Sequence, residues 1–332
     1  MRIASLCLLT AFLLAATAVA ASDPTCPDVD APPAPVCIAT PHGLAYADSE
    51  EEASGAARAL NDAAQRFAGY FGRAPTGAIV LSATLDPLVA REFARTHGLE
   101  FAQVWLPASA DRAMTERALR QSGLARGQIQ RALAGAATEN ESTLRHEVGH
   151  AMYAALYWPN ATGTRDARYG SPAPDWLDEA SAILMEGPES QAKYAAMFLG
   201  VTRRNPRSTP SLAEFIASEH PVRSAALARA LARAPKSTSG VQMVTVEGSG
   251  DFPGLDTFYG QSLLLGYFLT QTSGDTRILA PISTAIADGV TFEDWLAREG
   301  ASHRLPASMD ALETAWTAWL EQLRDAAARR AK

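Results

Sequence analysis

Residues 146–150 read His-Glu-Val-Gly-His, an arrangement in which two imidazoles lie four positions apart. Side chains with this spacing share one face of an α-helix, so His146 and His150 can bind one metal ion. Glu147 projects near the same face and can accept a proton from a water that the ion activates. Zinc favours this combination of imidazole ligands and a neighbouring general base, so the motif indicates a hydrolytic zinc site. So short a motif also occurs by chance in proteins that bind no metal.

A catalytic zinc ion usually takes a third protein ligand, with water in the fourth position. No histidine stands six residues after His150, which excludes one common source of that ligand. An acidic cluster begins a helix predicted for residues 175–186. From the residues alone, the third ligand is open between Asp175, Asp178 and Glu179, and Asp175 also suits the N-cap of this helix. The same cluster is typical of an ordinary helix start, because the helix dipole favours acidic side chains there.

Two helices must face each other for these side chains to meet. The first is predicted over residues 138–157, which carry apolar side chains at helical spacing and end before Pro159. Residues 158–174 are rich in Gly, Pro, Asn and Asp, which indicates a loop. The second helix, 175–186, ends at Gly187. This pattern predicts a helix–loop–helix unit that brings an acidic side chain towards the two histidines.

The whole chain predicts an α+β fold, with a small α/β subdomain at residues 39–137 in front of a helical zinc-binding and C-terminal subdomain at 138–332. In the first subdomain we expect strands at residues 42–47, 78–82 and 100–106, and helices at 50–71, 87–97, 110–122 and 125–136. In the second we expect further helices at residues 189–199, 210–216, 222–234, 257–269, 292–299 and 308–329, and a candidate strand at 241–246. The strand at 100–106 is either an interior strand or an edge strand to which an extended peptide adds.

Residues 1–21 have the pattern of a cleaved signal peptide. Arg2 supplies the positive start, residues 6–14 supply an apolar core, and residues 18–20 (Ala-Val-Ala) supply a cleavage site. A membrane-spanning helix is the alternative, but the apolar run is short for a bilayer. We therefore expect an exported protein, periplasmic or secreted, with no stable membrane insertion after signal cleavage.

The remaining cysteines fit this expectation. Cys26 and Cys37 flank a proline-rich stretch in a separate segment, residues 22–38, while Cys7 leaves with the signal peptide. In an exported protein two cysteines this close are expected to form a disulfide, with two unpaired thiols as the alternative.

The charge pattern bears on partners. The 332 residues carry a formal net charge of −7 and contain no basic block interleaved with aromatic residues, which argues against a nucleic-acid partner. Four histidines outside the motif have no metal-ligand spacing around them: His42, His97, His220 and His303. We expect them to be structural or exposed, although His220 or His303 could lie near the site.

The His-Glu-x-x-His motif followed by Trp-Leu-Asp-Glu-Ala at residues 176–180 resembles the gluzincin family of zinc metallopeptidases, in particular its exported, peptidase-MA-like bacterial members. In that family the glutamate before the small residue is the third zinc ligand. The resemblance therefore assigns that role to Glu179, with Asp175 and Asp178 as rivals. It is strongest over residues 138–182 and implies a zincin-like metallopeptidase fold with one Zn²⁺ per chain.

One position departs from the family pattern. Some gluzincins carry an aspartate four residues after the ligand glutamate, where it orients a histidine ligand, but this chain has Ile183 there. Asp178 is the candidate to take over that role. The resemblance also implies that Tyr259 donates a hydrogen bond to the reaction's oxyanion. A core tyrosine at the start of a buried helix is the alternative, and Tyr267 is a lesser candidate donor.

These patterns together predict a zinc-dependent peptide-bond hydrolase that acts on a peptide or protein substrate outside the cytoplasm. Zinc would be held by His146, His150 and Glu179, and Glu147 would be the general base. Two other functions are compatible with the same residues. One is a non-catalytic, zinc-bound scaffold of the cell envelope, and the other is a hydrolase of non-peptide amides or esters.

Overall fold

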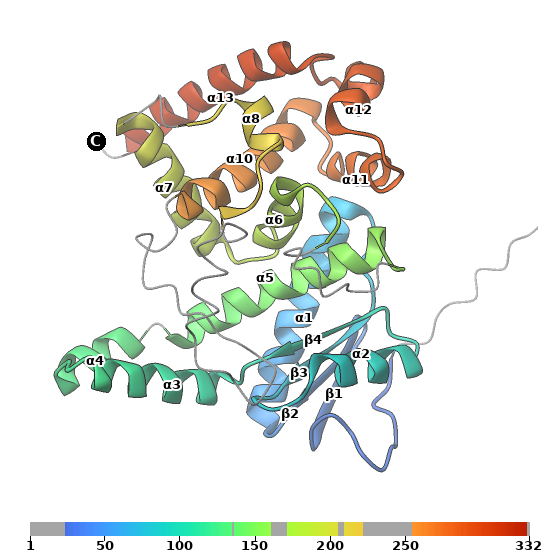
Figure 1. Ribbon diagram of the computed structural model, residues 1–332, viewed down its shortest axis with the longest axis vertical. Coiled ribbons are helices and arrows are strands. Elements are labelled where there is room, and N and C mark those ends of the chain that lie inside the picture. Colours follow the sequence, from blue (N-terminus) through green and yellow to red (C-terminus); the bar gives the residue numbers. More distant parts are fainter. Residues whose placement is uncertain (1–23, 135, 161–170, 205–208, 222–253, 331–332) are drawn as a thin grey trace, which may run out of the picture.

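The computed structural model of the chain describes residues 24–134, 136–160, 171–204, 209–221 and 254–330 (Figure 1). These residues form a mixed α+β structure that is mostly helical and contains a small four-stranded sheet. The coarse fold class expected from the sequence is therefore confirmed. The expected signal peptide, the helix at 222–234 and the strand at 241–246 lie outside the described residues.

The sheet has the strand order β1-β2-β3-β4. β1 (Val36–Thr40) and β2 (Gly43–Ala47) form an antiparallel hairpin, while β3 (Gly77–Leu81) and β4 (Phe101–Trp105) continue the sheet in parallel. β1 was not predicted, because its short run of residues follows the prolines of the 22–38 segment directly. Among the described strands β4 stands at the end of the order, which agrees with an edge position for this segment and not with an interior one.

Each face of the sheet is covered by a helix. Successive side chains of a strand point to opposite faces, so Ile79 packs on the side of α1 (Glu50–Phe71) and Val80 packs on the side of α2 (Pro87–Thr96). α1 begins where the Ser49 side chain accepts a hydrogen bond from the backbone nitrogen of Glu52, at 3.3 Å. Its buried face consists largely of alanines, which let the helix lie close to the sheet.

The helix of the His-Glu-Val-Gly-His motif lies across α1 (Figure 1). After α3 (Ala108–Gln121) and α4 (Arg126–Leu133), the chain enters α5 (Ala136–Tyr157). Leu144 and Val148 on α5 are buried in the core cluster that also contains the inner face of α1. Residues 146 and 150 point to the other side of the helix, so packing on α1 directs the histidines away from the sheet.

Gly149 determines how closely the next helix approaches α5. That helix, α6 (Asp175–Ile183), packs directly on α5. A Cβ atom at position 149 would lie 2.8 Å from the Cα atom of Ala182, closer than real side chains come. Glycine at the fourth position of the motif therefore lets α6 bring its acidic side chains to the two histidines.

The C-terminal helices cover the outer side of α6 (Figure 1). They are α7 (Pro188–Arg204), α8 (Leu212–Ile216), α10 (Leu255–Ser273), α11 (Leu279–Ala287), α12 (Phe292–Glu299), the 3₁₀ helix η3 (Gly300–His303) and α13 (Met309–Arg330). α10 packs on both α6 and α7, and α13 closes the end of the molecule above α8. α11 was not predicted.

The core is continuous from the sheet to the last helix. One cluster of buried apolar side chains runs from Ala45 on β2 through Val148 and Leu177 to Leu320 on α13. The boundary expected between residues 137 and 138 therefore lies within a shared core. A disulfide joins Cys26 to Cys37, as expected, and ties the proline-rich segment to β1. Among the described helices, none combines the length and apolar character needed to cross a bilayer.

Candidate metal centre

Three buried side chains converge between α5 and α6: His146, His150 and Glu179. One ligand atom from each lies within 4.8 Å of the other two. The Nε2 atoms of the two histidines are 3.1 Å apart. The Glu179 carboxylate faces both of them, with Oε2 3.5 Å from Nε2 of His146 and Oε1 3.6 Å from Nε2 of His150. The sequence prediction that these residues meet is therefore matched by the geometry.

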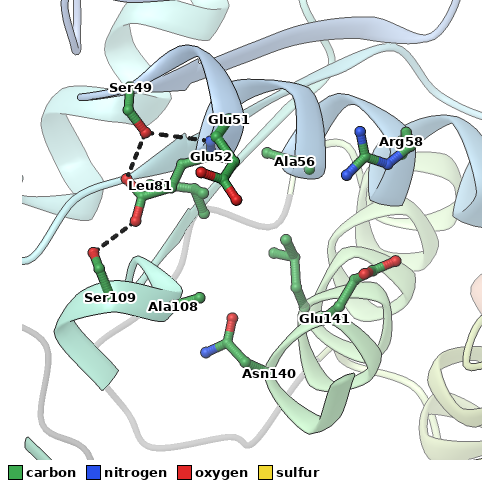
Figure 2. Close-up of a pocket in the computed structure, with 12 residues that line it drawn as sticks. Ser49, Glu51, Glu52, Ala56, Arg58, Leu81, Ala108, Ser109, Asn140 and Glu141 are labelled. Atoms are coloured by element: carbon green, nitrogen blue, oxygen red, sulfur yellow. Dashed lines mark hydrogen bonds between the residues drawn. The ribbon is translucent and has the colours of Figure 1, made fainter. Parts of the chain in front are cut away.

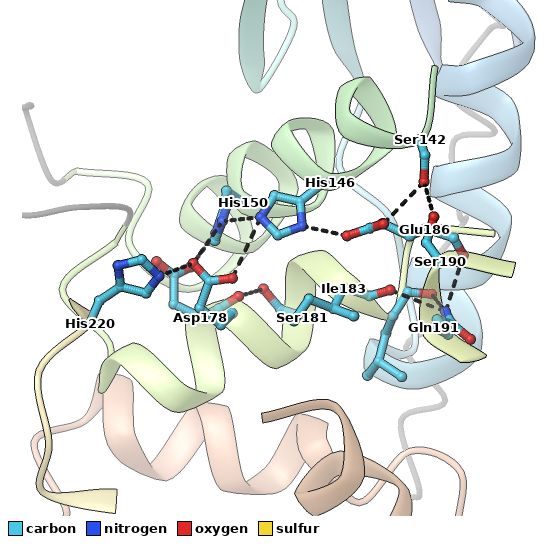
Figure 3. A network of polar contacts seen from close by, with 12 residues as sticks. Ser142, His146, His150, Asp178, Ser181, Ile183, Glu186, Ser190, Gln191 and His220 are labelled. Carbon is cyan, nitrogen blue, oxygen red and sulfur yellow. Dashed lines mark hydrogen bonds and ion pairs between the residues drawn. The ribbon is translucent and has the colours of Figure 1, made fainter. Parts of the chain in front are cut away.

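The outer nitrogen of each histidine faces a carboxylate (Figure 3). Nδ1 of His146 lies 2.9 Å from Oε1 of Glu186, and Nδ1 of His150 lies 3.2 Å from Oδ1 of Asp178. An ionised carboxylate only accepts hydrogen bonds, so each Nδ1 carries the proton and donates. The inner Nε2 atoms are then the ones that can bind a metal ion, and their orientation is fixed by the carboxylates.

The two orienting carboxylates are themselves held in place. Oε2 of Glu186 accepts a hydrogen bond from the hydroxyl of Ser142 at 3.0 Å. The hydroxyl oxygens of Ser142 and Ser190 are 2.7 Å apart and are hydrogen bonded to each other. Oδ2 of Asp178 accepts a hydrogen bond from the backbone nitrogen of Ser171 at 2.9 Å. Such supporting contacts are characteristic of metal sites, because they keep the imidazoles from rotating.

Glu179 provides the test of whether these residues fit a metal ion. Its side chain is about 1% exposed, yet neither carboxylate oxygen accepts a hydrogen bond. A buried carboxylate without such partners is costly, whereas a cation between it and the two imidazoles would supply the missing interaction. The residues present fit a metal ion, and the buried group of two histidines and one glutamate can hold one.

The titration behaviour of the group reflects its crowding. Burial lowers the pKa of His150, but the charge and hydrogen bond of Asp178, with the charge of Glu179, outweigh burial and raise the pKa to about 10. Burial also opposes the charged form of His146, whose pKa is raised by Glu186 and Glu179. Burial raises the pKa of Glu179 to about 7 against the charges of both histidines. Without a metal ion, the group therefore retains protons near neutral pH.

The two proposed catalytic side chains lie beside this group. Glu147 is half-buried, and its charge helps to raise the pKa of both His150 and Glu179. Tyr259, near the start of α10, has its ring centroid 6.0 Å from that of His146 and 5.5 Å from that of Tyr194. The structure thus brings residues from α5, α6 and α10 to one place.

The rival ligands have other roles. Asp178 supports His150 from behind, as the sequence suggested for a residue replacing the family aspartate. Asp175 does not cap α6, because the N-cap position is Pro174, and its Oδ2 instead accepts a hydrogen bond from the backbone nitrogen of His220 at 2.6 Å. Neither carboxylate belongs to the converging group.

Glu186 was missed as a residue of the site, and His220 was given no role there. Glu186 was predicted only as a helix end, but α6 stops at Ile183 and a turn places Glu186 against His146. That turn is held by Gln191, whose side-chain nitrogen donates to three backbone carbonyls of the turn at 3.1 Å each. The signal for Glu186 in the sequence was weak: it lies seven residues, or about two helical turns, after Glu179 and so falls on the same side of the predicted helix. His220 was expected to be structural or exposed, with room near the site, but a lone histidine has no ligand spacing that would assign it a role.

A separate cavity of about 560 Å³ lies between α1, the start of α3 and the first half of α5 (Figure 2). Its polar lining includes Glu52, which accepts a hydrogen bond from Ser109 at 2.6 Å, and Asn140. None of the metal-binding group lines it. The chemistry that the sequence indicates therefore does not lie in this cavity.

Comparison of the chain with protein-family models, with curated proteins and with solved structures finds no match.

Proposed function

We propose that His146, His150 and Glu179 bind one zinc ion and that the chain is a zinc-dependent peptide-bond hydrolase of the gluzincin type. The observation that carries the proposal is the convergence of these three ligand atoms while both outer imidazole nitrogens face carboxylates. Two imidazoles and one carboxylate are the donor set of catalytic zinc sites, which leave a fourth position for water. Magnesium and calcium prefer sites made of oxygen ligands alone.

The chain's own residues then perform the proton transfers. When bound, zinc lowers the pKa of a water molecule and polarises a carbonyl oxygen. Glu147 accepts the proton of the attacking water on its carboxylate and later donates it to the amine nitrogen of the departing product. The hydroxyl of Tyr259 donates a hydrogen bond to the oxyanion that forms at the attacked carbonyl. The half-buried position of Glu147 and the ring of Tyr259 beside His146 support these roles.

The substrate class is supported by the edge of the sheet. β4 lies at the end of the strand order and packs beside α5, which carries Glu147. The outer edge of such a strand offers backbone groups to which an extended peptide can add. An edge strand next to the motif helix, followed by a helix with the third ligand, is also the arrangement expected of a zincin-like fold. Export is supported by the signal-peptide pattern and by the disulfide.

The test is cleavage of a diverse peptide mixture by the purified mature chain, analysed by mass spectrometry. The Glu147→Gln variant removes the proton acceptor and leaves the ligands in place, so it should retain zinc and lose all cuts. Glu141→Gln on the same helix is the matched control, because Glu141 pairs with Arg145 at 2.6 Å and does not belong to the converging group. It should cut like the wild type.

Two results would overturn the proposal. Equal cleavage by wild type and Glu147→Gln would remove Glu147 as the base. A wild type that binds zinc but cuts no peptide would favour the scaffold function, unless a panel of non-peptide amides and esters revealed hydrolysis.

A further inference from the structure

His220 is a third histidine at the metal-binding group, contributed by the segment that follows α8. Its side chain is fully buried. Its backbone nitrogen is held by Asp175 at the start of α6, and its ring packs between Phe258 and Tyr259 of α10, with centroid distances of 5.1 Å and 5.6 Å. Contacts with α6 and α10 therefore set the position of the ring, and Figure 3 shows His220 beside the network of the two other histidines.

This ring contacts the carboxylate of the third candidate ligand. Nε2 of His220 lies 3.3 Å from Oε1 of Glu179. The other oxygen, Oε2, is the one nearest to Nε2 of His146. His220 is thus a polar side chain beside Glu179 that does not itself belong to the group of converging ligand atoms.

We propose that His220 is the positioning residue for Glu179, the third metal ligand. Each candidate ligand then has one partner behind it: Glu186 for His146, Asp178 for His150 and His220 for Glu179. A carboxylate on a flexible side chain rotates unless a donor engages one of its oxygens. Nε2 of His220, 3.3 Å from Oε1, would donate a hydrogen bond to that oxygen in the metal-bound site and so keep Oε2 directed to the ion. The inference rests on the proposed metal binding and not on the proposed peptidase activity.

The test compares replacements of His220 that differ in one property. His220→Gln keeps a side-chain N–H donor, whereas His220→Met has similar length and no donor, and His220→Phe keeps the ring but no donor. His303→Phe is the control, because His303 stacks on Trp295 in the C-terminal helices. For each variant we would measure the Zn²⁺ dissociation constant by competition with a chromophoric chelator, and the thermal unfolding of the metal-free protein.

The proposal predicts that His220→Met and His220→Phe weaken Zn²⁺ binding by about 10- to 100-fold, the usual effect of removing such a partner. His220→Gln should recover most of the affinity, and His303→Phe should match the wild type. A purely structural role would instead make affinity follow the unfolding temperature, irrespective of the donor. The visible spectrum of the Co²⁺-loaded protein should be the same in the wild type and the variants, because His220 is not a ligand.

Three outcomes would overturn the inference, and they are distinguishable. Unchanged Zn²⁺ affinity in both donor-less variants would show that Glu179 needs no partner. A Co²⁺ spectrum that changes with the His220 substitutions would make His220 a ligand. A wild type that binds no Zn²⁺ would remove the metal site itself, and with it the proposed function.

Discussion

Imidazoles and carboxylates alternate in the group of His146, His150 and Glu179 and their partners. This alternation explains how the imidazole rings are oriented and why the histidines hold protons. Glu186 faces His146, Asp178 faces His150, and Glu179 lies against both imidazoles. The two Nε2 atoms are 3.1 Å apart, a distance at which one of them must carry a proton if no cation lies between them. Protonated His150, with its pKa of about 10, meets that requirement.

Binding of Zn²⁺ to this site should release protons, in a number that depends on pH. The pKa of His150 is raised from 6.5 to about 10, so at pH 8 the metal-free protein holds a proton that metal binding must displace. Below about pH 7 the Glu179 carboxyl retains a second one. Zn²⁺ binding at pH 8 should therefore release at least one proton, and more at pH 6. Titration calorimetry in two buffers of different ionisation heat measures this number, and identical binding heats in both buffers would contradict it.

The raised pKa of His150 also makes the stability of the metal-free protein depend on pH. A histidine whose pKa is raised on folding stabilises the fold fully below its unfolded pKa of 6.5, and this contribution is lost as the pH rises towards about 10. Ionisation of Glu179 lowers the stability of the metal-free protein, whereas ionisation of an ordinary ion-paired carboxylate raises it. Because folding raises its pKa, ionising it between pH 4.5 and about 7 costs stability.

Helix packing is the next scale, and Gly149 controls it. The close approach of α5 and α6 at this position brings Glu179 to the histidines. Gly149→Ala should lower the free energy of unfolding by about 1–3 kcal/mol, because the added methyl overlaps the backbone of Ala182. It should also weaken Zn²⁺ binding, since the two helices must separate. Urea denaturation and chelator competition measure the two effects.

Gly200 on α7 is the matched control for this prediction. It is another helical glycine, but a Cβ atom there would meet no atom within 4 Å. Gly200→Ala should stabilise the protein by about 0.4–1 kcal/mol, because alanine loses less backbone entropy on folding. Equal effects of the two substitutions would mean that close packing of α5 and α6 does not depend on Gly149.

Predictability from sequence differed between elements for physical reasons. α1 and α12 match their predicted bounds, because apolar periodicity and caps both mark them. α6 ends three residues earlier than predicted, because the side chain of Gln191 donates hydrogen bonds to the backbone carbonyls of the turn after Ile183. No local pattern contains that contact. α11 was missed because its residues are nearly all small or apolar and carry no amphipathic period.

At the scale of the whole molecule, the metal-binding group is assembled from segments far apart in the chain. The motif itself was predictable, because His146, Glu147 and His150 lie on one helix. The partner of Glu179 was not, because His220 reaches it only through the packing of the segment after α8 on α6 and α10. Sequence spacing finds ligands on one element, whereas the residues that support them depend on the assembled core.

The zinc content of the purified chain, measured by elemental mass spectrometry after exhaustive dialysis, is the direct test of the metal site. We expect one zinc per chain in the wild type and in Glu147→Gln, and far less than one in His146→Leu and His150→Leu, each of which lacks one proposed ligand. A wild type with no more zinc than the two histidine variants would contradict the metal site and the hydrolytic function built on it.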